Sequence, residues 1–221
     1  MAEDEIAMAV REAKSRGKRV PANARSDQSV RYCLQYGIEI IYHASFGGDR
    51  TIDEPALGDD EFFVAPGWPG CATPATTRVP MGCQRRSRGQ MGYHAEYERA
   101  IETKGKMKQA GIRVLPGGDY GFAWTPHGTN ANDPEHFVDL LGFTPMEAIV
   151  AATRLGGEIM GRPNELGQVK PGFLADLILV DGDPIADIRV LQKRDRILAV
   201  MKDGRFHREM AGRRATNGIR G

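Results

Sequence analysis

The chain has 221 residues and a formal net charge of +1 at pH 7. A chain of this length can bury one good core, or a core with a small appendage, and its balanced charge gives no support to a nucleic-acid or membrane surface. It contains no run of about 18 apolar residues, the length that a membrane span needs. Three cysteines (Cys33, Cys71 and Cys83) and a start without an apolar leader favour reduced thiols in a cytoplasmic protein.

The first part of the chain predicts a helix, a strand, a second helix and a second strand. Apolar residues recur at helical spacing over 3–16, and a short strand-like run follows at 19–24. Ser26 can cap a helix that stops at Gly37, and the apolar strand 38–42 then ends at His43. Two strands joined through a helix should be parallel, with a right-handed connection.

The stretch 111–121 organises the rest of the chain. A helical pattern over 93–110 leads into it, and its apolar run ends in glycines that bracket one carboxylate, Asp119. We expect these glycines to permit a sharp turn and to leave room beside the acid for a ligand. An acid at the carboxyl end of a parallel strand is typical of α/β active sites, although an acid in a glycine-rich turn is also a common structural cap.

The last third of the chain changes from helix to strand. Thr144 and Glu147 form a capping box around Pro145, which predicts a helix from there to about Met160. From residue 166 onward, apolar runs at short spacing predict a small β-appendage.

The interval 68–90 has neither a helical nor a strand period. It contains three prolines with dispersed threonine and arginine residues, which leave little to bury. One interpretation is a long functional loop, although such loops are uncommon in compact domains. The other is a shifted reading frame over Cys71–Arg88, which the coding DNA would reveal.

Several segments together resemble the amidohydrolase superfamily. Residues 166–184, which contain Gly-Phe-Leu-Ala-Asp and Asp-Gly-Asp-Pro, are similar to its C-terminal signature, and 197–205 are similar to its closing hairpin. The stretch around Asp119 resembles the eighth barrel strand of this family, 62–67 its seventh, and 41–45 its sixth. The resemblance is greatest to the imidazolonepropionase-like branch, which includes hydrolases of acylated amino acids and dipeptides. It covers most of the chain outside roughly 47–92.

The resemblance implies a divalent metal, most often zinc, that activates water for attack on a carbonyl. Asp119 matches the eighth-strand aspartate, which implies metal binding and general acid–base catalysis. His43 matches the sixth-strand metal ligand, although a lone histidine at a strand end is more often a structural residue. His127 lies soon after Asp119 and is assigned a contact with substrate, with a surface-loop histidine as the alternative. Asn23 stands where the family has its fifth-strand histidine, and an amide oxygen is a poor replacement for imidazole on zinc.

We therefore expect an α/β fold, the C-terminal half of a TIM-like (β/α)8 barrel over 1–165 with strands five to eight, and part of a β-sandwich over 166–221. The expected activity is hydrolysis of a C–N bond in a small amide substrate, by a truncated or partly degenerate form of the enzyme. The alternative is a non-catalytic binding or assembly subunit of the same ancestry. Open barrel edges would favour a homo-oligomer or a complementing N-terminal half.

Overall fold

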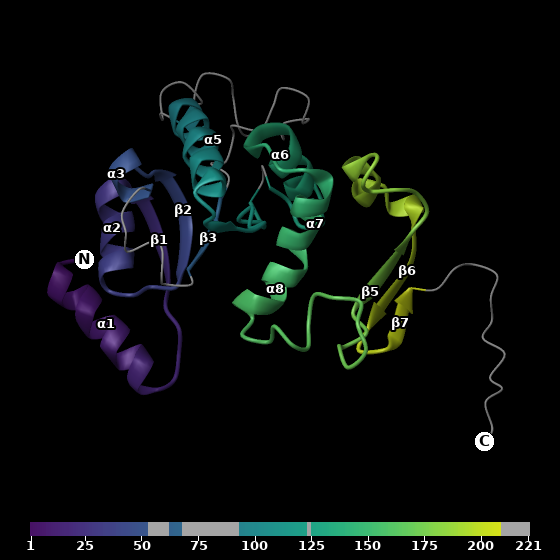
Figure 1. Cartoon of the computed structure of the whole chain (residues 1–221), viewed down its shortest axis with the longest axis horizontal. Helices are drawn as coiled ribbons and strands as arrows, with labels where there is room; N and C mark the ends of the chain where they lie inside the picture. Colours follow the sequence, from purple (N-terminus) through teal and green to yellow (C-terminus); the bar gives the residue numbers. More distant parts are fainter. Residues whose placement is uncertain (53–61, 68–92, 123–124, 209–221) are drawn as a thin grey trace.

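A computed structural model describes residues 1–52, 62–67, 93–122 and 125–208 (Figure 1). The interval 68–90, with its loop and frame-shift interpretations, lies outside these residues. Among the helices that are described, none is long and apolar enough to cross a membrane.

A parallel sheet of four strands forms the first part of the fold. Its strands follow one another in space as they do in the chain: β1 (Pro21–Ser26), β2 (Ile40–Phe46), β3 (Phe63–Ala65) and β4 (Arg113–Val114). This confirms an α/β fold with a parallel sheet, whereas the half-barrel and its domain limits stay predictions. The predicted end of the second strand at His43 was too early, because β2 continues to Phe46.

Helices connect and cover these strands. In chain order they are α1 (Glu3–Ser15), α2 (Asp27–Gln35), α3 (Asp49–Ile52), α5 (Tyr93–Gln109), α6 (Asn132–Leu141), α7 (Pro145–Ala152) and α8 (Arg154–Ile159). The predicted cap of α2 is confirmed, because the Ser26 hydroxyl accepts a hydrogen bond from the Ser29 amide. The predicted capping box of α7 is also confirmed, with the Thr144 hydroxyl accepting from the Glu147 amide.

The prediction of one helix from Pro145 to Met160 is wrong. The backbone leaves helical geometry at Thr153, with φ −123° and ψ −75°, and α8 begins at the next residue. The Thr153 hydroxyl donates to the carbonyl of Ile149 at 2.7 Å, the kind of back-bonding that bends helices.

An antiparallel sheet of three strands follows, in the order β5 (Leu177–Val180), β6 (Ile197–Lys202) and β7 (Arg205–Arg208). Asp203 and Gly204 join β6 to β7 with positive φ at both positions, the backbone that suits a tight hairpin. The 3-10 helices η2 (Ile188–Gln192) and η3 (Arg194–Arg196) precede β6. Figure 1 shows α6, α7 and α8 between the two sheets.

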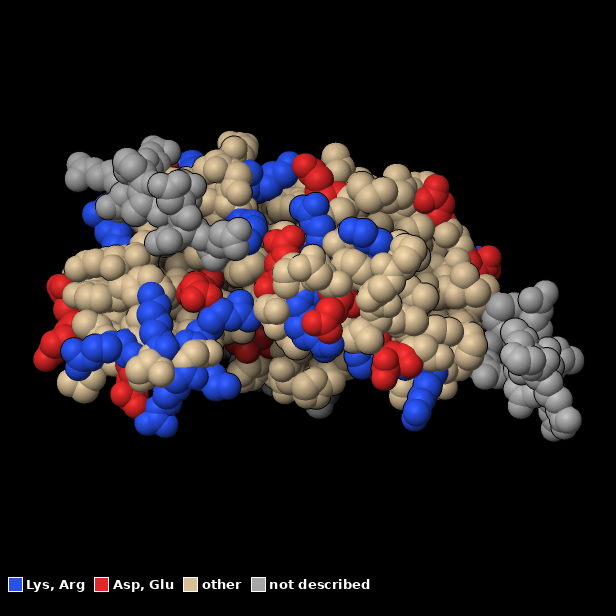
Figure 2. All heavy atoms as spheres, turned by 60° about the horizontal axis from the view of Figure 1, so that its bottom comes forward, with Lys and Arg blue, Asp and Glu red and all other residues tan. Residues whose placement is uncertain are grey.

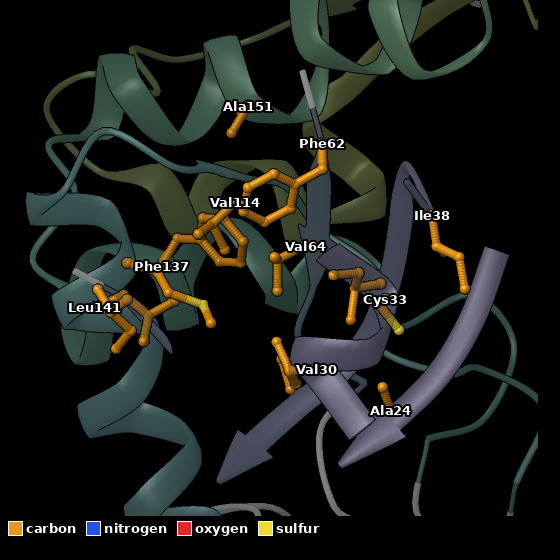
Figure 3. Close-up of a cluster of buried hydrophobic side chains, with 14 of the residues drawn as sticks. Ala24, Val30, Cys33, Ile38, Phe62, Val64, Val114, Phe137, Leu141 and Ala151 are labelled. Atoms are coloured by element: carbon orange, nitrogen blue, oxygen red, sulfur yellow. The ribbon is translucent and has the colours of Figure 1, made fainter. Parts of the chain in front are cut away.

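The core lies on one face of the parallel sheet. Ile41, Val64 and Val114 are paired neighbours in β2, β3 and β4, so their side chains share a face. That face packs against Val30 of α2 and Phe137 of α6, as Figure 3 shows for part of the cluster. On the face that Figure 2 shows, basic and acidic side chains are interspersed.

Candidate active site

His43 is held in an unusual backbone conformation near the carboxyl end of β2. Its φ is +70° and that of Ala44 is +45°, so two consecutive residues adopt the left-handed region that side chains disfavour. The His43 side chain is buried, and its Nδ1 lies 2.9 Å from the carbonyl oxygen of Gly67. Because a carbonyl can only accept, Nδ1 carries the proton, and the Nε2 lone pair is left for a ligand. This is the arrangement by which proteins fix metal-binding imidazoles.

Burial is the largest influence on the imidazole of His43 and lowers its pKa. The positive charges of Arg25 and Lys104 lower it further. The hydrogen bond to Gly67 and the carboxylate of Asp119 act in the opposite direction. The neutral imidazole is therefore favoured, and the sequence-predicted pair His43 and Asp119 lies close enough for electrostatic interaction.

Gly67, which follows β3, makes hydrogen bonds to residues near the ends of β2 and β4. Its carbonyl accepts from His43 of β2, and its amide donates at 2.8 Å to the carbonyl of Gly117, which follows β4. A side chain at Gly67 would collide with the His43 ring, so the ring lies directly against the glycine backbone. These bonds bring His43 beside the loop that carries Asp119.

Asp119 itself makes the turn after β4, with φ +54° and an exposed side chain. The two preceding glycines pack closely against other residues, and room for a ligand beside the Asp119 carboxylate stays a prediction. A Cβ on Gly117 would lie 2.7 Å from the Cβ of Ala65, and one on Gly118 would lie 2.6 Å from the Tyr120 ring. The space beside these glycines is filled by the protein's own side chains.

The segment after Asp119 folds back on itself. The Thr125 hydroxyl donates to the Asp119 carbonyl at 2.8 Å, and the Gly121 amide donates to the Thr125 carbonyl, also at 2.8 Å. His127 is exposed, and its Nε2 lies 3.3 Å from the position that a Cβ would take on Gly121. Its contact with substrate stays a prediction.

Asn23 lies in β1 in register with Tyr42, one position before the pair of Ala24 and His43. It is exposed, and Tyr42 is 38% exposed, so both lie on the sheet face opposite the core. The role of Asn23 as a degenerate ligand position stays a prediction.

A buried polar cluster beneath His43 was missed in the sequence. Lys104 of α5 is fully buried, and its Nζ donates to the carbonyl oxygen of His43. Glu96, also from α5, accepts from the Ser45 hydroxyl at 2.9 Å and from Arg25 at 3.0 and 3.1 Å. The cluster therefore joins α5 to the ends of β1 and β2.

Burial lowers the pKa of Lys104 to about 7, against the opposing effect of the Glu96 carboxylate. A signal for Lys104 was present in the sequence. Tyr97, Ala100 and Met107 form the apolar stripe of this helix, and Lys104 falls on the same stripe, seven residues after Tyr97. A lysine on a buried helix face needs a partner, and here the partner is the His43 carbonyl.

The residues fit part of a metal site. His43 offers a neutral imidazole nitrogen and Asp119 a carboxylate, both suitable for a divalent ion. Across the ranges that the structure describes, no group of three or more histidine, cysteine or acidic residues could hold a metal. Catalytic zinc normally has three protein ligands, so these two residues alone do not form a complete site.

Comparison with known proteins gives consistent results. The Amidohydrolase family matches residues 100–206. Ochratoxinase from Aspergillus niger is 25% identical over 207 residues, which are 92% of this chain and 41% of that relative. The chain therefore spans less than half the length of the curated relative.

Two solved structures show the shared fold. A Xaa-Pro dipeptidase with bound methionine is 24% identical, with a TM-score of 0.79 over 94% of this chain and 49% of that one. A prolidase complexed with N-methylphosphonate-L-proline is 22% identical, with a TM-score of 0.80 over 95% of this chain and 50% of that one. Together with the sequence matches, these likenesses confirm the resemblance to the amidohydrolase superfamily, of whose fold this chain covers a part.

Proposed function

We propose that this chain is part of a metal-dependent amidohydrolase that hydrolyses a C–N bond. One observation carries the proposal: His43 keeps Nε2 free for a ligand and interacts electrostatically with Asp119, near the carboxyl ends of parallel strands. The family match supports a hydrolase; the metal and the bond are our proposal.

In this proposal His43 and Asp119 contribute two ligands to a divalent metal, for which zinc is our first choice. A bound metal would supply polarisation of the substrate carbonyl and a lowered pKa of water. The Gly67 carbonyl orients the His43 ring, and the exposed Asp119 carboxylate holds the proton that passes from water to the leaving nitrogen.

The substrate class is proposed from the names of similar proteins. The terms Xaa-Pro dipeptidase and prolidase indicate dipeptides, so we propose small amides of this kind as substrates. His127 is proposed to contact them from the segment after Asp119.

The second candidate is a non-catalytic binding or assembly subunit. It is favoured by the incomplete ligand set of the described ranges and by the amide of Asn23 at a position where a histidine is expected. Assembly with a second copy is part of this candidate, whereas a complementing N-terminal half would make the chain one part of a split enzyme. Assembly is supported by the exposed β5 residues Ile178 and Leu179, and a compact monomer in light scattering would contradict it.

Hydrolysis of a panel of N-acyl amino acids and dipeptides, with zinc or manganese supplied, tests the proposal. Activity should be lost in Asp119→Asn and His43→Ala and kept in His207→Ala, a change of an exposed histidine on β7. Equal activity in all four proteins would refute the assigned site. A folded wild-type chain without activity towards any substrate would favour the non-catalytic candidate.

A further inference from the structure

We propose that Lys104 is a positioning residue for His43, which holds the His43 carbonyl from α5 and thereby fixes the imidazole against Gly67. The proposal concerns the same site as the proposed function and rests on it. Lys104 would not touch substrate or metal, because its Nζ binds the His43 backbone.

The backbone of β2 has an unusual conformation at its carboxyl end. The His43 carbonyl belongs to the peptide unit that joins two left-handed residues, His43 and Ala44. Such a conformation persists only where the surroundings hold it. The buried Lys104 Nζ supplies that hold, because its hydrogen bond fixes the orientation of this peptide unit.

The backbone conformation of His43 also determines where its ring lies. The direction of the His43 side chain follows from its φ angle, and at the observed value Nδ1 reaches the Gly67 carbonyl. Relaxation to an ordinary extended φ would swing the ring away from Gly67. The ring would then lose the hydrogen bond that keeps the proton on Nδ1 and leaves Nε2 free.

Lys104 is itself held in place by its neighbours. The Glu96 carboxylate supplies the opposite charge and is fixed by Arg25 and Ser45. The neighbouring Thr103 hydroxyl donates to the Ser45 carbonyl at 3.2 Å, so α5 binds the end of β2 through Thr103 and Glu96 as well as through Lys104. Only the Lys104 contact reaches His43, which makes Thr103 a matched control.

The test compares Lys104→Met, which keeps bulk and loses the donor, with Thr103→Val and with Lys106→Met on the surface of α5. The first measurement is the pair of imidazole ¹⁵N shifts of His43 in the metal-free protein, which report its tautomer. The second is zinc affinity by competition with a chromophoric chelator, repeated in a His43→Ala background.

We expect a single Nδ1-protonated tautomer in the wild type and both controls, and a mixture in Lys104→Met. Zinc affinity should fall about 10- to 100-fold in Lys104→Met, the range for groups that orient metal ligands. The loss should vanish in the His43→Ala background, which a general loss of stability would not produce. An unchanged tautomer in a folded Lys104→Met would overturn the proposal, as would an affinity loss that persists without His43.

These readouts separate the two proposals. A tautomer change in a protein that binds no zinc would support Lys104 and overturn the metal-dependent function. Zinc binding that is unchanged in Lys104→Met would support the metal-dependent function and overturn the role of Lys104. If Lys104→Met does not fold, Lys104→Gln retracts the donor by one atom. The same tautomer mixture is expected there, and a single tautomer would overturn the proposal.

Discussion

The buried ammonium of Lys104 should make the stability of the fold depend on pH. Its pKa is about 7 in the folded chain and 10.5 as the ordinary value, so between these limits the unfolded state binds more protons. The free energy of unfolding should therefore rise with pH across this window. With these two pKa values, linkage gives a gain of about 2 kcal/mol between pH 7 and pH 9.

Urea unfolding at pH 7, 8 and 9 under reducing conditions measures this gain. Lys104→Met should lack it, so the difference between wild type and variant isolates the contribution of one side chain. Lys106→Met is the control. Contacts with Asp49 and Glu102 raise the pKa of Lys106 in the folded chain, and its ordinary pKa of 10.5 keeps it charged in the unfolded chain over this range. The same pH slope in wild type and Lys104→Met would refute a buried Lys104 of lowered pKa.

Three further predictions concern the packing and capping of the fold. Burial raises the pKa of the Cys33 thiol to about 11. Iodoacetamide at pH 8 should therefore label Cys33 much more slowly in the folded chain than in urea. Equal labelling rates, followed by peptide mapping, would contradict the burial of Cys33. Thr144→Ala should cost about 1 kcal/mol by loss of the capping box, with Thr144→Ser close to wild type in urea unfolding. Phe137→Ala should lower the free energy of unfolding by about 3–5 kcal/mol, because Phe137 is fully buried and packs on Phe143 with 4.8 Å between ring centroids. A loss below about 1 kcal/mol would contradict this packing.

Local patterns predicted most elements of the fold. Ser26 and Thr144 marked helix starts because capping is decided by a few adjacent residues. The parallel strands could also be predicted, because buried parallel strands are short apolar runs in the sequence. Helix α6 was missed, although Phe137 and Leu141 lie four residues apart and Gly142 ends the helix with a φ of +71°.

Other features of the fold depend on contacts between distant residues, which local sequence patterns do not predict. The break at Thr153 depends on a side-chain bond that competes with the helix. The glycines before Asp119 were correctly singled out, but what fills the space beside them depends on Ala65 and Tyr120. His43 and Asp119 were identifiable by resemblance. The apolar stripe of α5 indicates that Lys104 is buried, but its partner, the His43 carbonyl, is determined by how α5 packs on β2.

Metal content of the purified chain tests the central claim most directly. Zinc, manganese and iron per chain would be measured in the wild type and in a His43→Ala/Asp119→Ala double variant. We expect about one metal ion per wild-type chain and loss of that metal in the variant. A folded wild type without metal, or equal metal in both proteins, would contradict it.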